Sequence, residues 1–305
     1  MPPRSPFIVG PPVRRDDFVD RDDTLRMLRQ LVTDRRGNIL LSGDRRAGKT
    51  SVCLQLDATL TGDQPKVAYI SMEANYERSP GQLAQAVLVK LLSTLAAVCF
   101  EKTYTQLLLD LRDAPTGLRD DYAALLRLFD LARQPADAGL LHQPDYLALL
   151  DDFVSYARQL GITNPFLVIV DEANKLTIEA NEVVIRENLS LLSKADLQFC
   201  FVTTPQVTAL VDSRELFHEV VEVGPFEDIG SLNALINTYM DTHRNQPIPT
   251  FEEPAIEMIW NLSRGMPYEM QLLCDESLIR AYRDGSPTVT AAHVVQATDA
   301  RGFRA

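Results

Sequence analysis

The stretch Gly43-Asp44-Arg45-Arg46-Ala47-Gly48-Lys49-Thr50 fits the pattern G-x-x-x-x-G-K-[ST] at every fixed position. Its glycines allow backbone N–H groups to surround phosphate oxygens, and a helix that starts here directs the positive end of its dipole at them. Lys49 would reach the β- and γ-phosphates of a nucleotide, and the Thr50 hydroxyl would bind Mg²⁺. An apolar run precedes the stretch and a helical pattern follows it, which is the context that a phosphate-binding loop requires.

Short apolar runs on either side of this loop predict buried strands. They cover residues 38–43, 66–72, 166–171, 197–204 and 219–226. Helical patterns separate them, at residues 24–34, at 83–95 and, with breaks at 114–117 and 134–144, along 101–160. Strands that are apolar on both faces and separated by helices indicate a parallel sheet covered by helices on both sides. We therefore expect an α/β fold.

The strand signal stops after Phe226. Helical patterns then occupy residues 228–242, 252–263, 267–284 and 290–300, which predicts a second, all-helical domain. We expect an extended arm rich in proline and arginine over residues 1–16, an α/β core over 17–226 and a helical lid over 227–305. The arginines of the arm either stay in solvent or contact phosphate or the acidic surface of a partner.

The composition is that of a folded chain and argues against several functions. Of the 305 residues, 46% are hydrophobic and 24% are charged, which rules out disorder over most of the chain. The 42 acidic and 30 basic residues give a formal net charge of −12, so the chain lacks an overall electrostatic footprint for nucleic acid. No apolar run is long enough to span a bilayer, and the N-terminus lacks the apolar core of a secretory signal. The 4 cysteines lie far apart in apolar stretches, which is typical of buried thiols, and we expect a cytoplasmic protein without membrane contact.

Acidic and hydroxyl residues follow two of the expected strands. Asp171 and Glu172 end the run FLVIVDE, where Asp171 would hold Mg²⁺ and Glu172 would act as general base toward the attacking water. A glutamate at this place favours hydrolysis over binding alone, and the alternative is that both acids only cap the next helix, 179–194. Thr203 and Thr204 end the other strand. One of the two hydroxyls would contact the γ-phosphate or orient the water, and an ordinary strand-end threonine is the alternative.

Taken in order, these features resemble the STAND/AAA+ group of P-loop ATPases over nearly the whole chain. Residues 6–13 and 17–22 (DFVDRD) resemble the arm and the “FVGRE” box of bacterial and archaeal members. The loop Gly43–Ser51 resembles their “GxRRxGKTS” loop. Residues 263–274 (SRGMPYEMQLLC) are similar to their “GGxPYxLQLLC” lid helix. The resemblance implies a P-loop NTPase core with a helical lid, nucleotide contacts along Gly43–Ser51, and ATP with Mg²⁺ as cofactors. ATP is favoured over GTP also because the chain lacks the guanine-specific N-K-x-D.

The same resemblance implies further nucleotide contacts outside the loop. Val19 and Arg21 would lie along the adenine, and the turn at Pro267 would close over the nucleotide. Three positions depart from the family pattern: Asp20 replaces the box glycine, Arg264 replaces the first lid glycine, and Tyr268 lies near the place of the lid arginine that AAA+ proteins use as a sensor. The lid would then sense the nucleotide through packing and backbone contacts, or through Arg264.

An arginine finger is a further expectation from the resemblance. Arg214 precedes the strand at 219–226, where AAA+ rings place an arginine that reaches the γ-phosphate in a neighbouring subunit. Such a charge can raise the rate by several orders of magnitude. A solvated surface arginine is the alternative, and Arg45 and Arg46 are alternatives within the loop itself.

These observations predict a slow, regulatory ATPase that uses hydrolysis to time a conformational switch. We expect either a signalling or defence-type switch that forms homo-oligomers or recruits a protein effector, an AAA+ regulator of DNA transactions such as an initiator, loader or transposition ATPase, or a nucleotide-binding scaffold with negligible turnover. The net charge and the lack of an evident winged helix count against the second class, and Glu172 counts against the third. The chain is either the ATPase module of a longer protein or a stand-alone subunit with partners.

Overall fold

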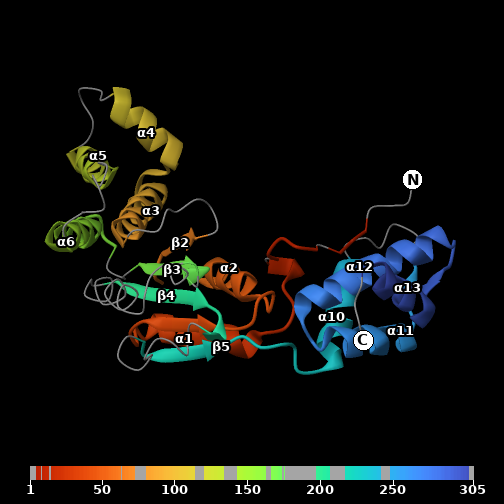
Figure 1. Cartoon of the computed structure of the whole chain (residues 1–305). Coiled ribbons are helices and arrows are strands. Elements are labelled where there is room, and N and C mark those ends of the chain that lie inside the picture. The colour runs from red at the N-terminus through yellow and green to blue at the C-terminus, as the bar shows by residue number, and fades with distance from the viewer. Residues whose placement is uncertain are drawn as a thin grey trace. The chain divides into compact units, whose positions relative to one another are not determined.

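A computed structural model gives the fold of the chain (Figure 1). It describes residues 5–7, 9–13, 15–62, 64–72, 80–113, 120–133, 143–162, 166–173, 175, 197–206, 217–241 and 248–301. The chain divides into two compact units. One, the P-loop unit, consists of residues 1–26, 43–58 and 222–305, and the other, the sheet unit, consists of 27–42 and 59–221.

The sheet unit is built on a five-stranded sheet in the order β2-β3-β4-β1-β5. The strands are β1 (Ile39–Ser42), β2 (Val67–Ser71), β3 (Leu167–Asp171), β4 (Gln198–Thr203) and β5 (Glu219–Glu222). The pairs β2–β3, β3–β4 and β4–β1 are parallel, and every residue of β1, β3 and β4 is buried. A parallel sheet covered on both faces needs continuous apolar strands, which is the pattern that the sequence shows. Helices flank the sheet, and the predicted α/β class is confirmed.

The register of this sheet brings polar residues to one edge. Ser42 pairs with Thr203, and Ser71 pairs with Asp171, so the carboxyl ends of four strands meet there. Chain order fixes the start of the phosphate-binding loop at the same place, because Gly43 directly follows β1. Ligands of open parallel sheets bind outside this edge.

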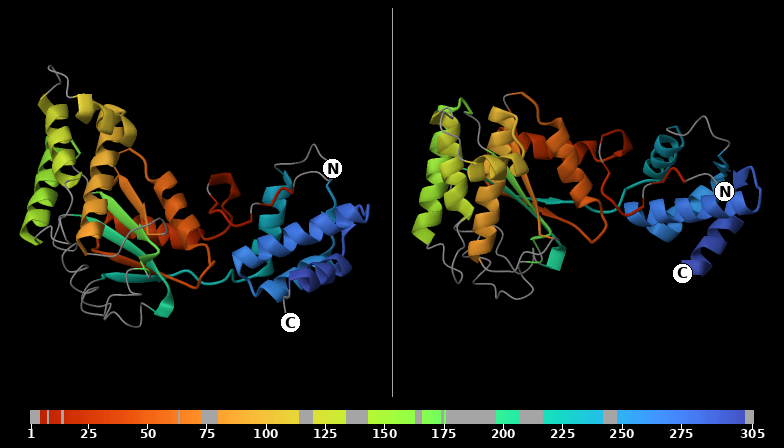
Figure 2. Two further views of the ribbon diagram at one scale, coloured as in Figure 1. Left: turned by 45° about the horizontal axis from the view of Figure 1, so that its top comes forward. Right: turned by 90° about the horizontal axis from the view of Figure 1, so that it is seen from above.

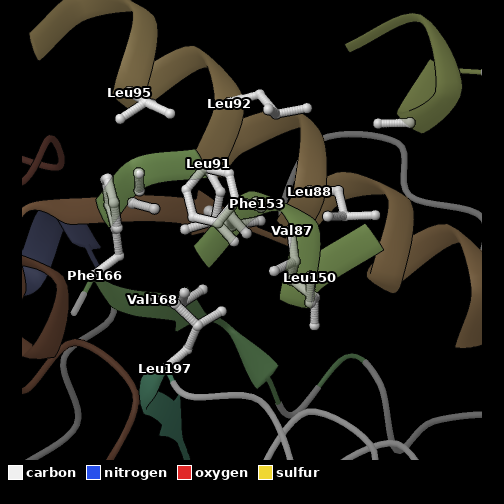
Figure 3. Close-up of a cluster of buried hydrophobic side chains, with 14 of the residues drawn as sticks. Val87, Leu88, Leu91, Leu92, Leu95, Leu150, Phe153, Phe166, Val168 and Leu197 are labelled. Atoms are coloured by element: carbon white, nitrogen blue, oxygen red, sulfur yellow. The ribbon is translucent and has the colours of Figure 1, made fainter. Parts of the chain in front are cut away.

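The helices that lie between β2 and β3 in the chain form a layer beside the sheet (Figure 2). These are α3 (Pro80–Phe100), α4 (Tyr104–Asp113), α5 (Asp120–Arg133) and α6 (Gln143–Gln159). Most residues of the hydrophobic core of the sheet unit belong to these helices and to the strands. Leu88, Leu91 and Leu95 recur on one face of α3 and are fully buried (Figure 3). Phe153 of α6 meets Phe166 beside β3 with ring centroids 5.2 Å apart. The predicted helix at 83–95 and the helices along 101–160 are confirmed where the structure describes them.

Helix α1 (Asp22–Thr33), close to the predicted 24–34, also contacts the sheet unit's strands. The Gln198 side chain on β4 donates hydrogen bonds to the carbonyl oxygens of Leu31 at 3.1 Å and Gly37 at 2.7 Å. The end of this helix is therefore tied to the start of β4. None of the helices that the structure describes is long and apolar enough to cross a membrane.

The P-loop unit contains α2 (Lys49–Thr59) and the four helices expected after Phe226. These are α10 (Ile229–Asp241), α11 (Glu253–Ser263), α12 (Pro267–Arg283) and α13 (Ala291–Arg301). The expectation of an all-helical segment needs one correction, because β6 (Thr250–Phe251) and β7 (Thr288–Val289) form a small parallel sheet. Strands of two residues are too short to show a hydrophobic period, so the sequence carries no signal for them.

The described part of the N-terminal arm contacts the rest of the P-loop unit through Phe7, Val13 and Arg15, while residues 10–12 and Arg15 itself are exposed. Phe7 is 7% exposed, and its ring lies 5.5 Å from that of Tyr239 on α10. The Val13 N–H donates to Ser51 Oγ at 3.1 Å, and the Arg15 N–H donates to a side-chain oxygen of α2 at 2.7 Å. The arm begins inside a hydrophobic core and ends on the helix that follows the phosphate-binding loop. Arg4 and Arg14 lie outside the described residues.

Candidate functional site

The phosphate-binding loop runs from Gly43 to the start of α2 at Lys49. An added Cβ on Gly43 would lie 2.2 Å from the Val223 carbonyl oxygen, so only glycine fits the close approach of these two backbones. Gly48 has φ +92°, which glycine adopts at little cost, whereas Arg46 has φ +69°, which costs a residue with a Cβ roughly 1–2 kcal/mol. The tightly turned backbone before a helix N-terminus is the arrangement that binds phosphate.

The Lys49 ammonium lies inside this loop. Its Nζ donates hydrogen bonds to the carbonyl oxygens of Gly43 and Asp44, each at 2.7 Å. A phosphate group attracts an ammonium more strongly than neutral carbonyls do, so Lys49 is placed to move onto β- and γ-oxygens. Thr50, the second residue of α2, is half buried. The turned loop backbone, the ammonium of Lys49 and the hydroxyl of Thr50 are groups of the kind that bind a magnesium nucleotide.

Arg21 contacts the loop from the side. Its Nη2 donates to the carbonyl oxygens of Gly224 and, at 3.4 Å, of Ala47, and its guanidinium carbon lies 4.8 Å from the centre of the Phe226 ring. Burial lowers the pKa of Arg21, and the charge of Asp20 opposes this shift. The guanidinium stays protonated because its ordinary pKa is far above neutrality. Arg21 therefore joins the loop to residues 223–226 within the P-loop unit.

Residues 223–226 were expected to continue the last strand, but β5 ends at Glu222. The Phe226 N–H donates to the Gly265 carbonyl oxygen at 2.8 Å, and a Cβ on Gly265 would lie 2.5 Å from the Phe226 oxygen. This segment thus approaches Gly43 at one end and the turn before α12 at the other. These contacts replace strand pairing, which explains the shorter strand.

Two of the departures from the family pattern keep a backbone shape that glycine favours. Asp20 has φ +62°, and Arg264, the C-cap of α11, has φ +50°. Both lie in the left-handed region, where glycine carries no Cβ penalty. Both positions therefore have a backbone conformation that a glycine would adopt at lower cost. Pro267 is the first residue of α12, and Val19 packs half buried against the helical core. Their contacts with a nucleotide, and that of Arg21 with adenine, stay predictions.

Arg46 of the loop contacts the first turn of α12. Its guanidinium carbon lies 4.0 Å from the centre of the Tyr268 ring, and its Nη1 lies 3.5 Å from Glu269 Oε1. The other oxygen, Glu269 Oε2, is buried and has no hydrogen-bond partner among the described residues. A loop arginine is thereby held by an aromatic ring and a carboxylate of the helical segment.

The acidic pair lies at the edge of the sheet unit. Asp171 is 3% exposed, and it accepts hydrogen bonds from the Tyr69 hydroxyl at 2.5 Å and from the Glu172 N–H at 2.8 Å. Glu172 has φ +56°, and its Oε2 forms an ion pair with Lys175 Nζ. A buried, oriented carboxylate followed by a partly exposed one suits a magnesium ligand and a general base.

The two threonines at the end of β4 differ in burial. Thr203 is 1% exposed, and its hydroxyl has no hydrogen-bond partner among the described residues, whereas Thr204 is half buried. A buried hydroxyl without a partner costs free energy unless something else binds it. This favours Thr203 over Thr204 as the residue that meets a ligand. Arg214 and the helix expected at 179–194 lie outside the described residues.

Several residues at these sites do not stand out in the sequence as functional. Tyr69 lies in an apolar strand, and its only distinguishing mark is the one hydroxyphenyl group in the run KVAYISM. Lys175 stands three residues after Glu172, a spacing at which charges pair on a helical turn. Arg46 was weighed as an arginine finger, and no sequence signal links it to Tyr268.

Comparisons with known proteins agree with the fold and the loop. A family model described as an AAA domain matches residues 32–211. No curated protein sequence matches the chain. The Orc1 protein of Aeropyrum pernix in complex with DNA is similar in structure, with 16% identity and a TM-score of 0.54 over 95% of this chain and 66% of that one. Drosophila ORC bound to DNA matches with 17% identity and a TM-score of 0.51 over 94% of this chain and 62% of that one. This chain thus spans less than two thirds of the length of both.

Proposed function

Because the chain belongs to the AAA domain family, whose model covers more than half of it, we propose that it is a magnesium-dependent ATP-hydrolysing conformational switch. The observation that carries the proposal is the phosphate-binding loop. Its Gly43 lies so close to the Val223 backbone that no side chain fits there, and the Lys49 ammonium lies inside the loop. A second observation is the oriented Asp171 beside Glu172, because a protein that only binds phosphate does not need a base.

The residues of the P-loop unit would bind the triphosphate. Backbone N–H groups between Gly43 and Ser51 surround the β-phosphate, and Lys49 neutralises charge on the β- and γ-oxygens. Thr50 and Asp171 would hold Mg²⁺, which when bound offsets the charge that develops between the β- and γ-phosphates. Val19 and Arg21 would lie along the adenine, and the turn at Pro267 would close over the nucleotide.

Hydrolysis would take place next to the edge of the sheet. The Glu172 carboxylate accepts a proton from water as the water oxygen attacks the γ-phosphorus, and ADP leaves with the electron pair of the bond that breaks. The ion pair with Lys175 occupies Oε2, so either Oε1 accepts the proton or Lys175 first gives way to water. The Thr203 hydroxyl would donate a hydrogen bond to a γ-phosphate oxygen; its burial without a partner among the described residues supports this role.

As a switch, the protein would transmit nucleotide state to partners. The proposed class is a signalling or defence-type regulator that assembles into homo-oligomers or recruits a protein effector when ATP is bound. A second candidate is a regulator of DNA transactions, because two proteins that share this fold are described as bound to DNA. The net charge of −12 counts against that candidate. A scaffold without turnover is the third.

Two variants test the proposal. Lys49→Ala should abolish ATP binding in calorimetry, because the phosphates lose their cation. Glu172→Gln should bind ATP like the parent and release no phosphate, because the amide cannot accept the proton. If Glu172→Gln hydrolyses ATP at the parental rate, Glu172 is not the general base. If the parent itself hydrolyses no ATP, only the nucleotide-binding scaffold stays as a candidate function.

Light scattering separates the candidate roles. Gel filtration with ATP, with ADP and without nucleotide should show a larger assembly with ATP if the protein is an oligomerising switch. Filaments that form only on DNA, and dissolve as salt rises, would favour the DNA regulator instead.

A further inference from the structure

We propose that Arg46 is the residue through which bound phosphate controls α12: the nucleotide takes the Arg46 guanidinium from Tyr268 and Glu269 and thereby releases the first turn of that helix. The inference rests on the proposed nucleotide site and adds to it a route from the loop to the helical segment. All three residues belong to the P-loop unit.

The position of Arg46 on the chain points to this role. It lies within the stretch that would surround the phosphates, two residues before Gly48, so its backbone belongs to the anion site. Its side chain leads away to α12, and its backbone stays left-handed at φ +69°. Strained conformations of this kind persist where the surroundings impose them, and they concentrate at switches and ligand sites.

The partners of Arg46 hold it weakly enough to be exchanged. The ring contact at 4.0 Å is a cation–π interaction, and the Arg46 side chain is 50% exposed, so water weakens both it and the ion pair at 3.5 Å. A phosphate oxygen pair offers the planar guanidinium two parallel charge-assisted hydrogen bonds, which are stronger than either contact. A bound triphosphate is therefore able to displace Tyr268 and Glu269 as partners of the guanidinium.

Glu269 turns this exchange into a movement of the helix. Its Oε2 is buried with no hydrogen-bond partner among the described residues, and the side chain is only 24% exposed, so the Arg46 charge adds to the stabilisation that the helix N-terminus gives this carboxylate. Once Arg46 turns to the phosphates, the carboxylate loses that charge and faces the negative nucleotide. Both effects favour moving the first turn of α12 toward water.

Variants of α12 test the exchange without altering the loop. Tyr268→Leu removes the ring and keeps apolar volume, Glu269→Gln removes the charge and keeps the shape, and Tyr268→Phe is the matched control because it keeps the ring. The probe is a non-hydrolysable ATP analogue with Mg²⁺, titrated into the full chain by calorimetry. Losing one competing contact should tighten binding about two- to fivefold in Tyr268→Leu and Glu269→Gln, and Tyr268→Phe should match the parent.

A second measurement reports on the helix itself. Hydrogen exchange of residues 266–271 should speed up when the analogue binds to the parent, and it should already be fast, with little further change, in Tyr268→Leu and Glu269→Gln. The fluorescence of Trp260, the single tryptophan of the chain, follows the neighbouring end of α11 as a check. Denaturation curves show whether each variant is folded. If Tyr268→Leu does not fold, Glu269→Gln alone is sufficient to test the exchange.

Weaker or unchanged binding in Glu269→Gln, with the same nucleotide-induced exchange as the parent, would overturn the inference. Because the analogue is not hydrolysed, that result says nothing against the ATPase. Conversely, a parent that binds the analogue but releases no phosphate from ATP would refute the proposed turnover and leave the role of Arg46 standing.

Discussion

Replacing Gly43 by alanine tests the packing that shapes the phosphate-binding loop. The added Cβ would lie 2.2 Å from the Val223 oxygen, 3.1 Å from the Val223 carbonyl carbon and 3.3 Å from its Cβ, whereas ordinary contact begins at 3.4 Å. One of the two backbones must therefore move by about 1 Å, and forced shifts of this size cost about 1–3 kcal/mol. We expect the free energy of unfolding to fall by that amount.

The same displacement should reach catalysis, because the N–H groups that would bind phosphate are fixed to Gly43. A misplacement of about 1 Å can lower the rate by about 10²-fold. The assays are urea denaturation, calorimetry with a non-hydrolysable ATP analogue, and phosphate release. Gly224→Ala is the matched control: it lies next to Val223, nothing stands within 4 Å of its added Cβ, and its backbone carbonyl stays available to Arg21. Parental stability and binding in Gly43→Ala, or equal losses in Gly224→Ala, would refute the reasoning.

Three further substitutions address the residues around hydrolysis. Thr203→Val removes, at constant shape, a hydroxyl that has no partner among the described residues, so stability should be kept or rise. Phosphate release should fall about tenfold or more if the hydroxyl binds the γ-phosphate. A variant with parental turnover would make Thr203 an ordinary core residue. Lys175→Met frees Glu172 from a half-exposed pair worth at most about 1 kcal/mol, so turnover should rise by up to about fivefold, and a fall would show that Lys175 orients the base instead. Arg214→Ala should lower turnover but not ATP affinity if the arginine acts in a neighbouring subunit. Mixing this variant with Lys49→Ala protein should then restore activity. If the mixture shows no recovery, and turnover of the parent does not depend on protein concentration, Arg214 is a surface residue.

The strands and the loop could be predicted from sequence because each carries a local signal. The strands β1, β3 and β4 are buried on both faces, so they appear as continuous apolar runs, and the residues after β1 contain every fixed position of a phosphate-binding motif. The polar ends of β3 and β4 were also visible, and their shared edge follows from parallel pairing. Fold class and the main candidate residues thus rest on short stretches of the chain.

The contacts between distant residues could not be predicted in this way. Arg46 and Tyr268 are brought together only by the folded P-loop unit, and Tyr69 reaches Asp171 from another strand at hydrogen-bond distance. The choice of Thr203 over Thr204 depends on burial, which two adjacent residues of the same type do not reveal in sequence. The burial of Phe7 could not be predicted for a similar reason, because its aromatic partners lie more than two hundred residues away in the chain.

The division of the P-loop unit into three separate segments has a consequence for how the protein is made. Residues 27–42 and 59–221 leave the ribosome before residues 222–305, so the sheet unit is complete in sequence while Phe7 and the phosphate-binding loop still lack the helices that cover them. Contacts across such long separations form slowly. During synthesis, the contact of Phe7 with Tyr239 and the contact of Gly43 with Val223 can form only after residues 223 and 239 have been made. A nascent chain should therefore complete the proposed nucleotide site only after residues 222–305 have been made.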